Sequence, residues 1–163
     1  MSDVLTFLLI EFAPDDPGAT GNRPAEVAHR VVRDAGGALV DDPAGPPSTL
    51  AARFHIAGDA ALAAVQVARA LRSAPPRMAL CTGEADPRGS TLGGSARARA
   101  RALLRAAQPR QVLVTASTAV MASPALPRQA ELVDHGIRAL DPATPPERVY
   151  ELRPGPGDGD GDG

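Results

Sequence analysis

Two kinds of hydrophobic pattern alternate along this chain. Short apolar runs bounded by Gly, Pro or Asp predict buried strands, and they lie at residues 4–12, 38–40, 50–56, 78–82 and 111–115. Segments whose apolar residues recur three and four positions apart predict amphipathic helices, and they lie at residues 24–35, 59–72 and 95–108. Beyond them, a short helix is predicted at residues 117–122 and two terminal strands at residues 131–133 and 148–152.

The order of these elements predicts the fold class. Strand, helix, strand, strand, helix and strand follow one another in the first half of the chain, which is the order of a ferredoxin-like α+β fold. The remaining helices and strands extend this βαββαβ core. We therefore expect one sheet with its helices on one face.

The length fits one domain. A chain of 163 residues buries enough surface to fold without a disulfide or a metal. We assign residues 1–153 to this domain and expect the Gly/Asp-rich tail at residues 154–163 to be disordered.

Charge and composition exclude several classes of function. The 17 basic residues are all arginines, and 19 acidic residues give a net charge of −2. A nucleic-acid-binding domain is normally basic, so we expect no nucleic-acid partner. No apolar run approaches the roughly 20 residues that span a bilayer, and no positive region precedes the first run. We therefore expect no membrane contact, no signal peptide and a cytoplasmic location. The absence of lysine indicates a GC-rich source genome.

Cys81 is the single cysteine of the chain. One cysteine excludes an internal disulfide and offers no metal cluster. Because it lies in a strand-like apolar run, we expect a buried side chain rather than a nucleophile.

Several segments together resemble the class III adenylate and guanylate cyclases. Residues 77–84 read Arg-Met-Ala-Leu-Cys-Thr-Gly-Glu, which is similar to the family strand R-M-G-L-H-T-G-E. Residues 111–115, 131–136 and 147–152 are similar to the family segments Q-V-L-V-S, E-L-R-D-L-G and E-R-V-Y-Q-L, and residues 58–71 to the Ala-rich helix between them. The order and spacing of these segments carry the resemblance, which covers residues 4–152. The chain thus resembles a degenerate member with a class III nucleotide cyclase-like fold.

The resemblance implies a site built from two chains. Family cyclases bind a nucleoside triphosphate between two protomers, and two aspartates on adjacent strands of one protomer hold a pair of metal ions. An Asn and an Arg on a helix of the other protomer position the ribose and stabilise the transition state. A Lys often selects the purine. The resemblance therefore implies a homodimer.

The positions that hold the two metal ions in the family cyclases carry different residues in this sequence. Glu11 falls in the slot of the first aspartate, and Ser48 falls in the slot of the second. The phosphate loop is replaced by Ala-Pro-Asp-Asp-Pro at residues 13–17, where Pro has no N–H to donate and the carboxylates repel phosphate. Asp41 or Asp42 remains an alternative second ligand, if the loop is rearranged.

The helix positions are altered as well. Alignment without a gap places Ala98 and Ala102 in the Asn and Arg slots, whereas a shift of one residue places Arg97 and Arg101 there. The chain has one asparagine, Asn22, in a different region, and no lysine. Each such group contributes on the order of 10²–10³ in rate. We therefore expect a pseudoenzyme that binds no metal or cofactor and acts as a regulatory, protein-interaction or ligand-sensing module in signalling. The alternative is an active purine nucleotide (adenylate) cyclase with atypical metal and transition-state residues.

The predicted helix at residues 95–108 also suggests partners. Arg97, Arg101 and Arg105 share one of its faces, which fits a solvated face, the rim of a dimer or a site for a small anionic ligand. An apolar stripe beside them would let a second chain approach closely, and it consists of Ala96, Ala100, Leu103, Leu104 and Ala107. We expect a homodimer or another signalling protein on this face.

Overall fold

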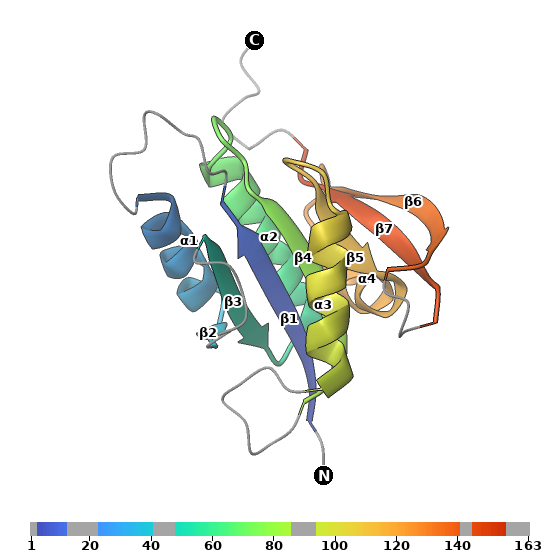
Figure 1. The fold of residues 1–163 in the computed structure, drawn as a ribbon. Coiled ribbons are helices and arrows are strands. Elements are labelled where there is room, and N and C mark those ends of the chain that lie inside the picture. The colour runs from blue at the N-terminus through green and yellow to red at the C-terminus, as the bar shows by residue number, and fades with distance from the viewer. Residues whose placement is uncertain (1–2, 13–22, 41–47, 86–93, 141–144, 156–163) are drawn as a thin grey trace.

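A computed structural model describes residues 3–12, 23–40, 48–85, 94–140 and 145–155. Its strands and helices lie within a few residues of the predicted ones (Figure 1). In chain order they are β1 (Asp3–Glu11), α1 (Arg23–Asp34), β2 (Ala38–Leu39), β3 (Thr49–Phe54), α2 (Ala57–Ala70), β4 (Arg77–Ala85), α3 (Gly94–Ala106), β5 (Val112–Thr115), α4 (Ala116–Ala122), the 3-10 turn η1 (Ser123–Ala125), β6 (Glu131–Arg138) and β7 (Glu147–Arg153).

The strands form one seven-stranded sheet in the order β2-β3-β1-β4-β5-β7-β6. Neighbouring strands are antiparallel except β4 and β5, which are parallel. The first four strands, with α1 and α2, have the order of a ferredoxin-like fold. The α+β prediction is therefore confirmed.

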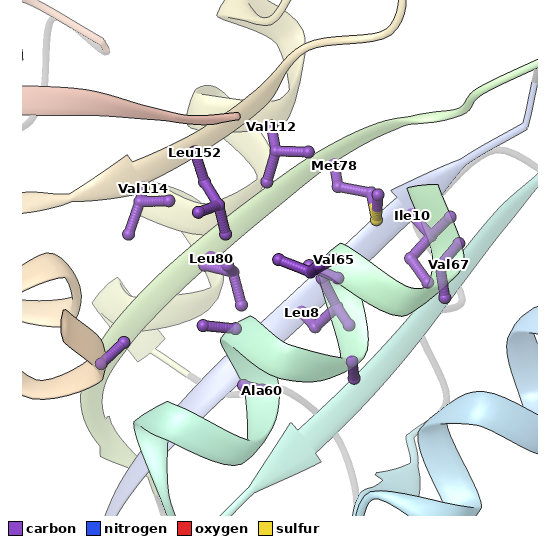
Figure 2. Packing of buried hydrophobic residues seen from close by; sticks show 14 of the residues in the cluster. Leu8, Ile10, Ala60, Val65, Val67, Met78, Leu80, Val112, Val114 and Leu152 are labelled. Carbon is purple, nitrogen blue, oxygen red and sulfur yellow. The ribbon is translucent and has the colours of Figure 1, made fainter. Parts of the chain in front are cut away.

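Two hydrophobic clusters cover the two faces of the sheet. On one face, residues of α1, α2 and α4 pack against side chains such as Leu8, Ile10 and Leu80 (Figure 2). On the other face, α3 packs against Leu5, Phe7 and Leu9. Because successive side chains of a strand point to opposite faces, β1 is buried on both sides. This explains its nearly continuous apolar sequence.

The position of α3 corrects the expectation that all helices lie on one face. β3 and β4 are both antiparallel to β1 and are therefore parallel to each other. The β3–α2–β4 and β4–α3–β5 connections step the same way along the sheet, yet α2 and α3 lie on opposite faces. The two connections thus have opposite hands: the first is right-handed, as is usual, and the second is left-handed (Figure 1).

Four buried threonines connect α4 to the sheet through their hydroxyls. Thr82 on β4 forms hydrogen bonds with Thr6 on β1 at 2.9 Å and with Thr118 on α4 at 2.7 Å. Thr118 also forms a hydrogen bond with Thr115, the last residue of β5, at 2.8 Å. The hydroxyls satisfy one another where water has no access, which fixes α4 against three strands.

β6 is longer than predicted because it continues through a bulge between Asp134 and Ile137. Gly136 lies in this bulge with a φ of 79°, a conformation that glycine adopts without strain. Bulges bend the edge strand of a sheet and interrupt its pairing surface. The predicted strand ended at residue 133, whereas the observed strand bends near this point and continues.

The end of the described chain contacts α2. Arg69 donates a hydrogen bond from Nη2 to the carbonyl oxygen of Pro154 at 2.9 Å. Residues 156–163 lie outside the described residues, so the division of the chain at residue 153 and the disorder of the tail stay predictions. No helix of the described part is long and apolar enough to cross a membrane.

Candidate functional site

Glu11 and Arg77 form an ion pair on the α3 face of the sheet, at the end of β1. The register of β1 and β4 places them directly opposite each other. Arg77 donates from Nε and Nη2 to the same oxygen, Oε1 of Glu11, at 3.0 and 2.7 Å. Its Nη1 donates to the carbonyl oxygen of Ala107, just after α3, at 3.0 Å. The first expected metal ligand is thus bound to a guanidinium of its own chain, a partner that the sequence analysis did not assign.

The structure brings the second expected metal position next to the first. The N–H of Phe12 donates to the carbonyl oxygen of Ser48 at 3.0 Å, and Thr49 pairs with Glu11 across β1 and β3. Ser48 is exposed. The Thr49 hydroxyl is buried and has no hydrogen-bond partner in the described part of the chain. Two strand ends therefore meet here, as the resemblance implies.

The donors at these strand ends do not fit a pair of metal ions. Mg²⁺ and related ions in nucleotide sites are held by carboxylates together with phosphate oxygens. Among the described residues at these strand ends, Glu11 supplies the single carboxylate, while Ser48 and Thr49 carry neutral hydroxyls. Arg77 is a fixed cation within hydrogen-bond distance of the carboxylate and repels a second cation. Within the described residues, no group of three or more His, Cys, Asp or Glu residues could hold a metal ion.

The alternative ligands and the phosphate loop are not described. Asp41 and Asp42 lie outside the described residues, and so does the segment at residues 13–17. Whether either aspartate replaces the second ligand therefore stays a prediction.

The expected transition-state positions lie on α3, away from Glu11. Residues 97 and 98 are near the start of this helix, whereas Glu11 lies near its end, by Ala107. Ala98 is exposed, Ala102 is buried, and Arg101 is half-buried and makes contacts of its own. Arg97 belongs to α3, but its side chain lies outside the described part. One chain therefore does not bring the two expected halves of the site together.

The apolar stripe of α3 faces the chain's own sheet. Four of its residues are buried in the cluster on this face, and they are Ala100, Leu103, Leu104 and Ala107. The expectation that this stripe meets a second chain is therefore wrong. Sequence periodicity identified the apolar side of the helix, but it could not tell which sheet covers that side.

Arg99 forms a second ion pair on the same face. Its Nε and Nη2 donate to the two carboxylate oxygens of Glu147, the first residue of β7, at 3.0 and 2.9 Å. Cys81 lies below this pair with no exposed surface. Burial raises the pKa of Cys81 to about 11, although the positive charge of Arg99 opposes the shift. A raised pKa keeps a thiol protonated at neutral pH, and the prediction of a buried cysteine is confirmed.

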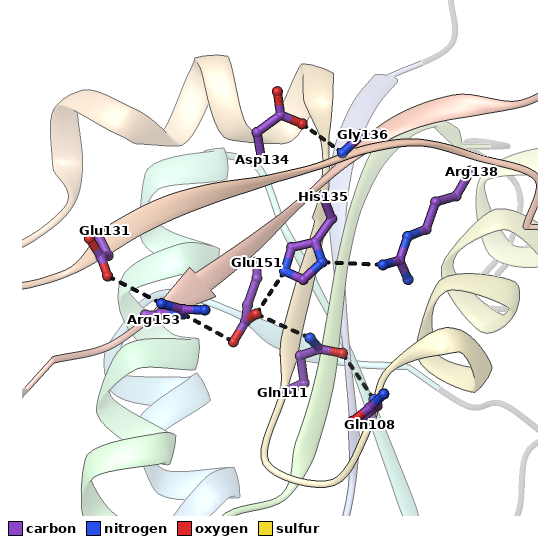
Figure 3. A network of polar contacts seen from close by, with 9 residues as sticks. All are labelled: Gln108, Gln111, Glu131, Asp134, His135, Gly136, Arg138, Glu151 and Arg153. Atoms are coloured by element: carbon purple, nitrogen blue, oxygen red, sulfur yellow. Dashed lines mark hydrogen bonds and ion pairs between the residues drawn. The ribbon is translucent and has the colours of Figure 1, made fainter.

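A polar network covers β5, β7 and β6 on the α3 face (Figure 3). Glu151 accepts hydrogen bonds from Gln111 at 3.1 Å and from His135 Nε2 at 2.8 Å. His135 Nδ1 lies 3.2 Å from Arg138 Nη2, and because arginine only donates, Nδ1 accepts and Nε2 carries the proton. Burial raises the pKa of Glu151, but the donors from Gln111, His135 and Arg153 outweigh it and hold the pKa below its usual range.

The sequence analysis missed this network. His135 stands in the sequence without metal-ligand spacing to another histidine, so no local pattern signals it. The alternation of β7 places Glu151 on the α3 face, but only the strand order puts Gln111 and His135 on either side of it.

Comparisons with known proteins identify the fold. No family model matches the sequence, and no curated protein sequence matches it. The solved structure of an adenylate/guanylate cyclase/hydrolase from Silicibacter pomeroyi is similar, with a TM-score of 0.74 and 18% identity over 93% of this chain and 96% of that one. The adenylyl cyclase CyaB from P. aeruginosa gives a TM-score of 0.69 and 16% identity over 94% and 95% of the two chains.

A third structure shares the fold and is described as a dimer. It is the non-canonical dimeric guanylyl cyclase domain of the RhoGC fusion protein from Blastocladiella emersonii, with a TM-score of 0.70 and 12% identity over 92% of this chain and 96% of that one. This chain therefore has the fold of class III adenylate/guanylate cyclase catalytic domains. At sequence identities of 18%, 16% and 12%, the likeness to these structures shows the fold alone.

The comparisons correct the expectation that the chain is not an enzyme. The solved structures that share its fold are named as adenylate or guanylate cyclases, which are enzymes. None of these names describes an inactive homologue. The comparisons therefore give no support for classing the chain as a pseudoenzyme.

Proposed function

We propose that this chain, with its class III nucleotide cyclase fold, is a signalling domain that works as one half of a pair of cyclase-type domains. Its role in the pair is regulatory, through protein interaction. The proposal rests on one observation, which is that helices cover the two faces of the sheet unequally. In the described part of the chain, α1, α2 and α4 pack on one face, and α3 alone packs on the other.

The parts of the α3 face that no described helix covers are suited to a second protein. Arg53 on β3 lies to one side of α3 and is half-buried. To the other side, Gln111, His135 and Glu151 are half-buried and already ordered by hydrogen bonds. Ordered polar groups lose little side-chain entropy on binding. We take a second copy of the chain as the partner, and a different cyclase-type domain as the alternative.

Light scattering behind size exclusion tests the pairing. At tens of micromolar the wild type should show about twice the chain mass of 16.7 kDa. Ala98→Arg places a bulky charge on the exposed side of α3 and should give the monomer mass. Val120→Arg is the matched control, because Val120 is 75% exposed on α4 over the opposite face. A monomer at all concentrations would exclude the homodimer and leave a different partner protein.

A second candidate function is cyclisation of a purine nucleoside triphosphate, adenylate cyclase activity in particular. One observation favours it: Thr49, whose buried hydroxyl has no hydrogen-bond partner in the described part of the chain, is the cross-strand partner of Glu11. The test is production of cyclic AMP or cyclic GMP from ATP or GTP with Mg²⁺ or Mn²⁺. Product that disappears in Glu11→Gln would establish catalysis. Product from neither protein would leave the regulatory role.

A further inference from the structure

Two residues of the polar network distinguish this chain from the cyclase segments that it resembles. His135 stands where the family segment E-L-R-D-L-G has Leu, and Glu151 stands where E-R-V-Y-Q-L has Gln. The strand order brings the two replacements together, since His135 Nε2 donates to Glu151 Oε1 at 2.8 Å. Their side chains are 21% and 17% exposed. A hydrogen-bonded histidine and carboxylate thus occupy positions where the family segments have an apolar residue and a neutral amide.

A bulge in β6 places a cation against the other nitrogen of the ring. Residues three apart in a regular strand point to opposite faces, but the three steps from Asp134 to Ile137 match only two steps along β7. The extra residue turns Arg138 to the face of His135, and Arg138 Nη2 lies 3.2 Å from the ring Nδ1. Asp134 holds the bulge, because its Oδ1 accepts from the N–H of Gly136 at 2.7 Å. The two ring nitrogens therefore have different partners, a carboxylate and a guanidinium (Figure 3).

Charged side chains lie around the ring on three elements. They are Arg138 and Asp134 on β6, Glu147, Glu151 and Arg153 on β7, and Arg99 on α3. Arg99 and Glu147 are bound to each other. From β5 the neutral amide of Gln111 donates to Glu151. Among the described residues, Arg138 is thus the cation that contacts the ring, and Glu151 is the carboxylate.

Protonation changes what the ring can bind. Neutral His135 accepts at Nδ1 and donates at Nε2, whereas a protonated imidazole carries an N–H at both nitrogens. Histidine is the side chain whose charge normally changes between about pH 5 and 8. The protonated ring keeps its hydrogen bond to Glu151 but has no acceptor for Arg138. Two positive charges then face each other in place of the hydrogen bond.

We infer that His135 is a proton-operated switch for Arg138. When the ring is neutral, Arg138 is bound to Nδ1, and when the ring is protonated, Arg138 is released into the solvent to which it is already exposed. Acidification thus adds one positive charge and an unbound guanidinium to this side of the α3 face. The inference goes beyond the proposed pairing and holds for a single chain.

Nitrogen-15 NMR of the full chain tests the switch. In the neutral state the long-range proton–nitrogen spectrum should show His135 as the Nε2–H tautomer, with its signals assigned from His135→Gln. The Nε–H signal of Arg138, assigned from Arg138→Met, should shift between about pH 8 and pH 5 with the same midpoint as the ring. It should not shift in His135→Gln. An Nδ1–H tautomer, or an Arg138 signal that does not follow the ring, would overturn the inference.

The titration midpoint of the ring supplies the second measurement. Arg138→Met removes the donor that favours the neutral ring, so the midpoint should rise by roughly half a pH unit. Arg148→Met is the matched control, because it removes an exposed cation of the same hairpin that binds Asp134, and its shift should be smaller. Equal shifts would show that Arg138 acts through charge alone and would refute the switch. A monomeric chain with the expected titration would contradict the proposed pairing and leave this inference intact.

Discussion

Arg99 on α3 and Glu147 on β7 form a paired contact in which two guanidinium nitrogens meet two carboxylate oxygens. The residues are 48 positions apart in sequence, and their side chains are 26% and 20% exposed. The contact closes α3 over the sheet next to the buried Cys81.

Removal of this ion pair should destabilise the protein measurably. Arg99→Gln should lower the free energy of unfolding by about 1–2 kcal/mol, because half-buried charged groups lose their hydrogen-bond partners. Urea unfolding of both single variants and the double variant Arg99→Gln/Glu147→Gln gives the coupling energy. The control is Arg148–Asp134, whose side chains are 44% and 49% exposed and whose coupling should be smaller. Equal coupling energies in the two pairs would show that burial does not strengthen the Arg99–Glu147 pair.

The hydroxyl chain of the four threonines should depend on Thr118, one of its two inner members. Thr118→Val preserves shape but removes a hydrogen-bond partner from both Thr82 and Thr115, at an expected cost of about 1–3 kcal/mol. Thr6→Val should cost less, because Thr82 still has Thr118 as a partner. Urea midpoints of the two variants test this order. The reverse order would show that Thr118 does not hold α4 in place.

The Glu151 network should stabilise the folded protein at pH values above the range in which the Glu151 carboxyl becomes protonated. The pKa of Glu151 is lower in the folded protein than its usual value, so the unfolded chain binds more protons as pH falls and stability declines. The contribution is fully present above the ordinary carboxyl pKa of about 4.3 and is lost as pH falls through the folded value.

Urea midpoints between neutral pH and pH 3 should therefore fall less steeply for Glu151→Gln than for the wild type. Glu131→Gln is the control, since the Glu131 side chain is 63% exposed and lies 3.7 Å from Arg153. An unchanged slope in Glu151→Gln would contradict the role given to this carboxylate.

The last ten residues should divide into a contacting part and a dispensable part. Removal of residues 156–163 should leave the thermal midpoint unchanged, because a segment of Gly and Asp with one Pro offers little apolar surface for burial. Further removal of Pro154 and Gly155 takes away the acceptor of Arg69, whose buried Nε has no hydrogen-bond partner among the described residues. The midpoint should then fall by roughly 2–8 °C, as expected for about 1–2 kcal/mol in a chain of this length. Differential scanning calorimetry of the two truncations distinguishes these outcomes, and equal midpoints would show that the Arg69 contact is unimportant.

Local pattern was sufficient for most of the secondary structure. β1 was recognisable from its apolar run because it is buried on both faces. The end of α1 was recognisable from Gly36, which has a φ of 95° just beyond the helix. β6 was predicted too short because a bulge at Gly136 interrupts the alternation of its side chains.

The sequence also showed which positions differ from those of the cyclase family. It did not show which residues surround these positions in space. Glu11 could be placed in the first metal slot by alignment, but its partner Arg77 is 66 residues away. Two residues so far apart meet only through the pairing of their strands. Strand pairing depends on the packing of the whole sheet and leaves no local signal.

The sequence by itself determined which segments form strands and helices, and with them the ferredoxin-like order of the core. This follows because apolar periodicity and breaking residues act within a few positions along the chain. Only the tertiary structure decided that α3 lies on the opposite face from the other helices. The usual right-handed rule for crossovers predicts the same face for α2 and α3, and the α3 crossover is left-handed. Once α3 occupies that face, Ala107 and Arg99 approach Arg77 and Glu147, and the two ion pairs of the site can form.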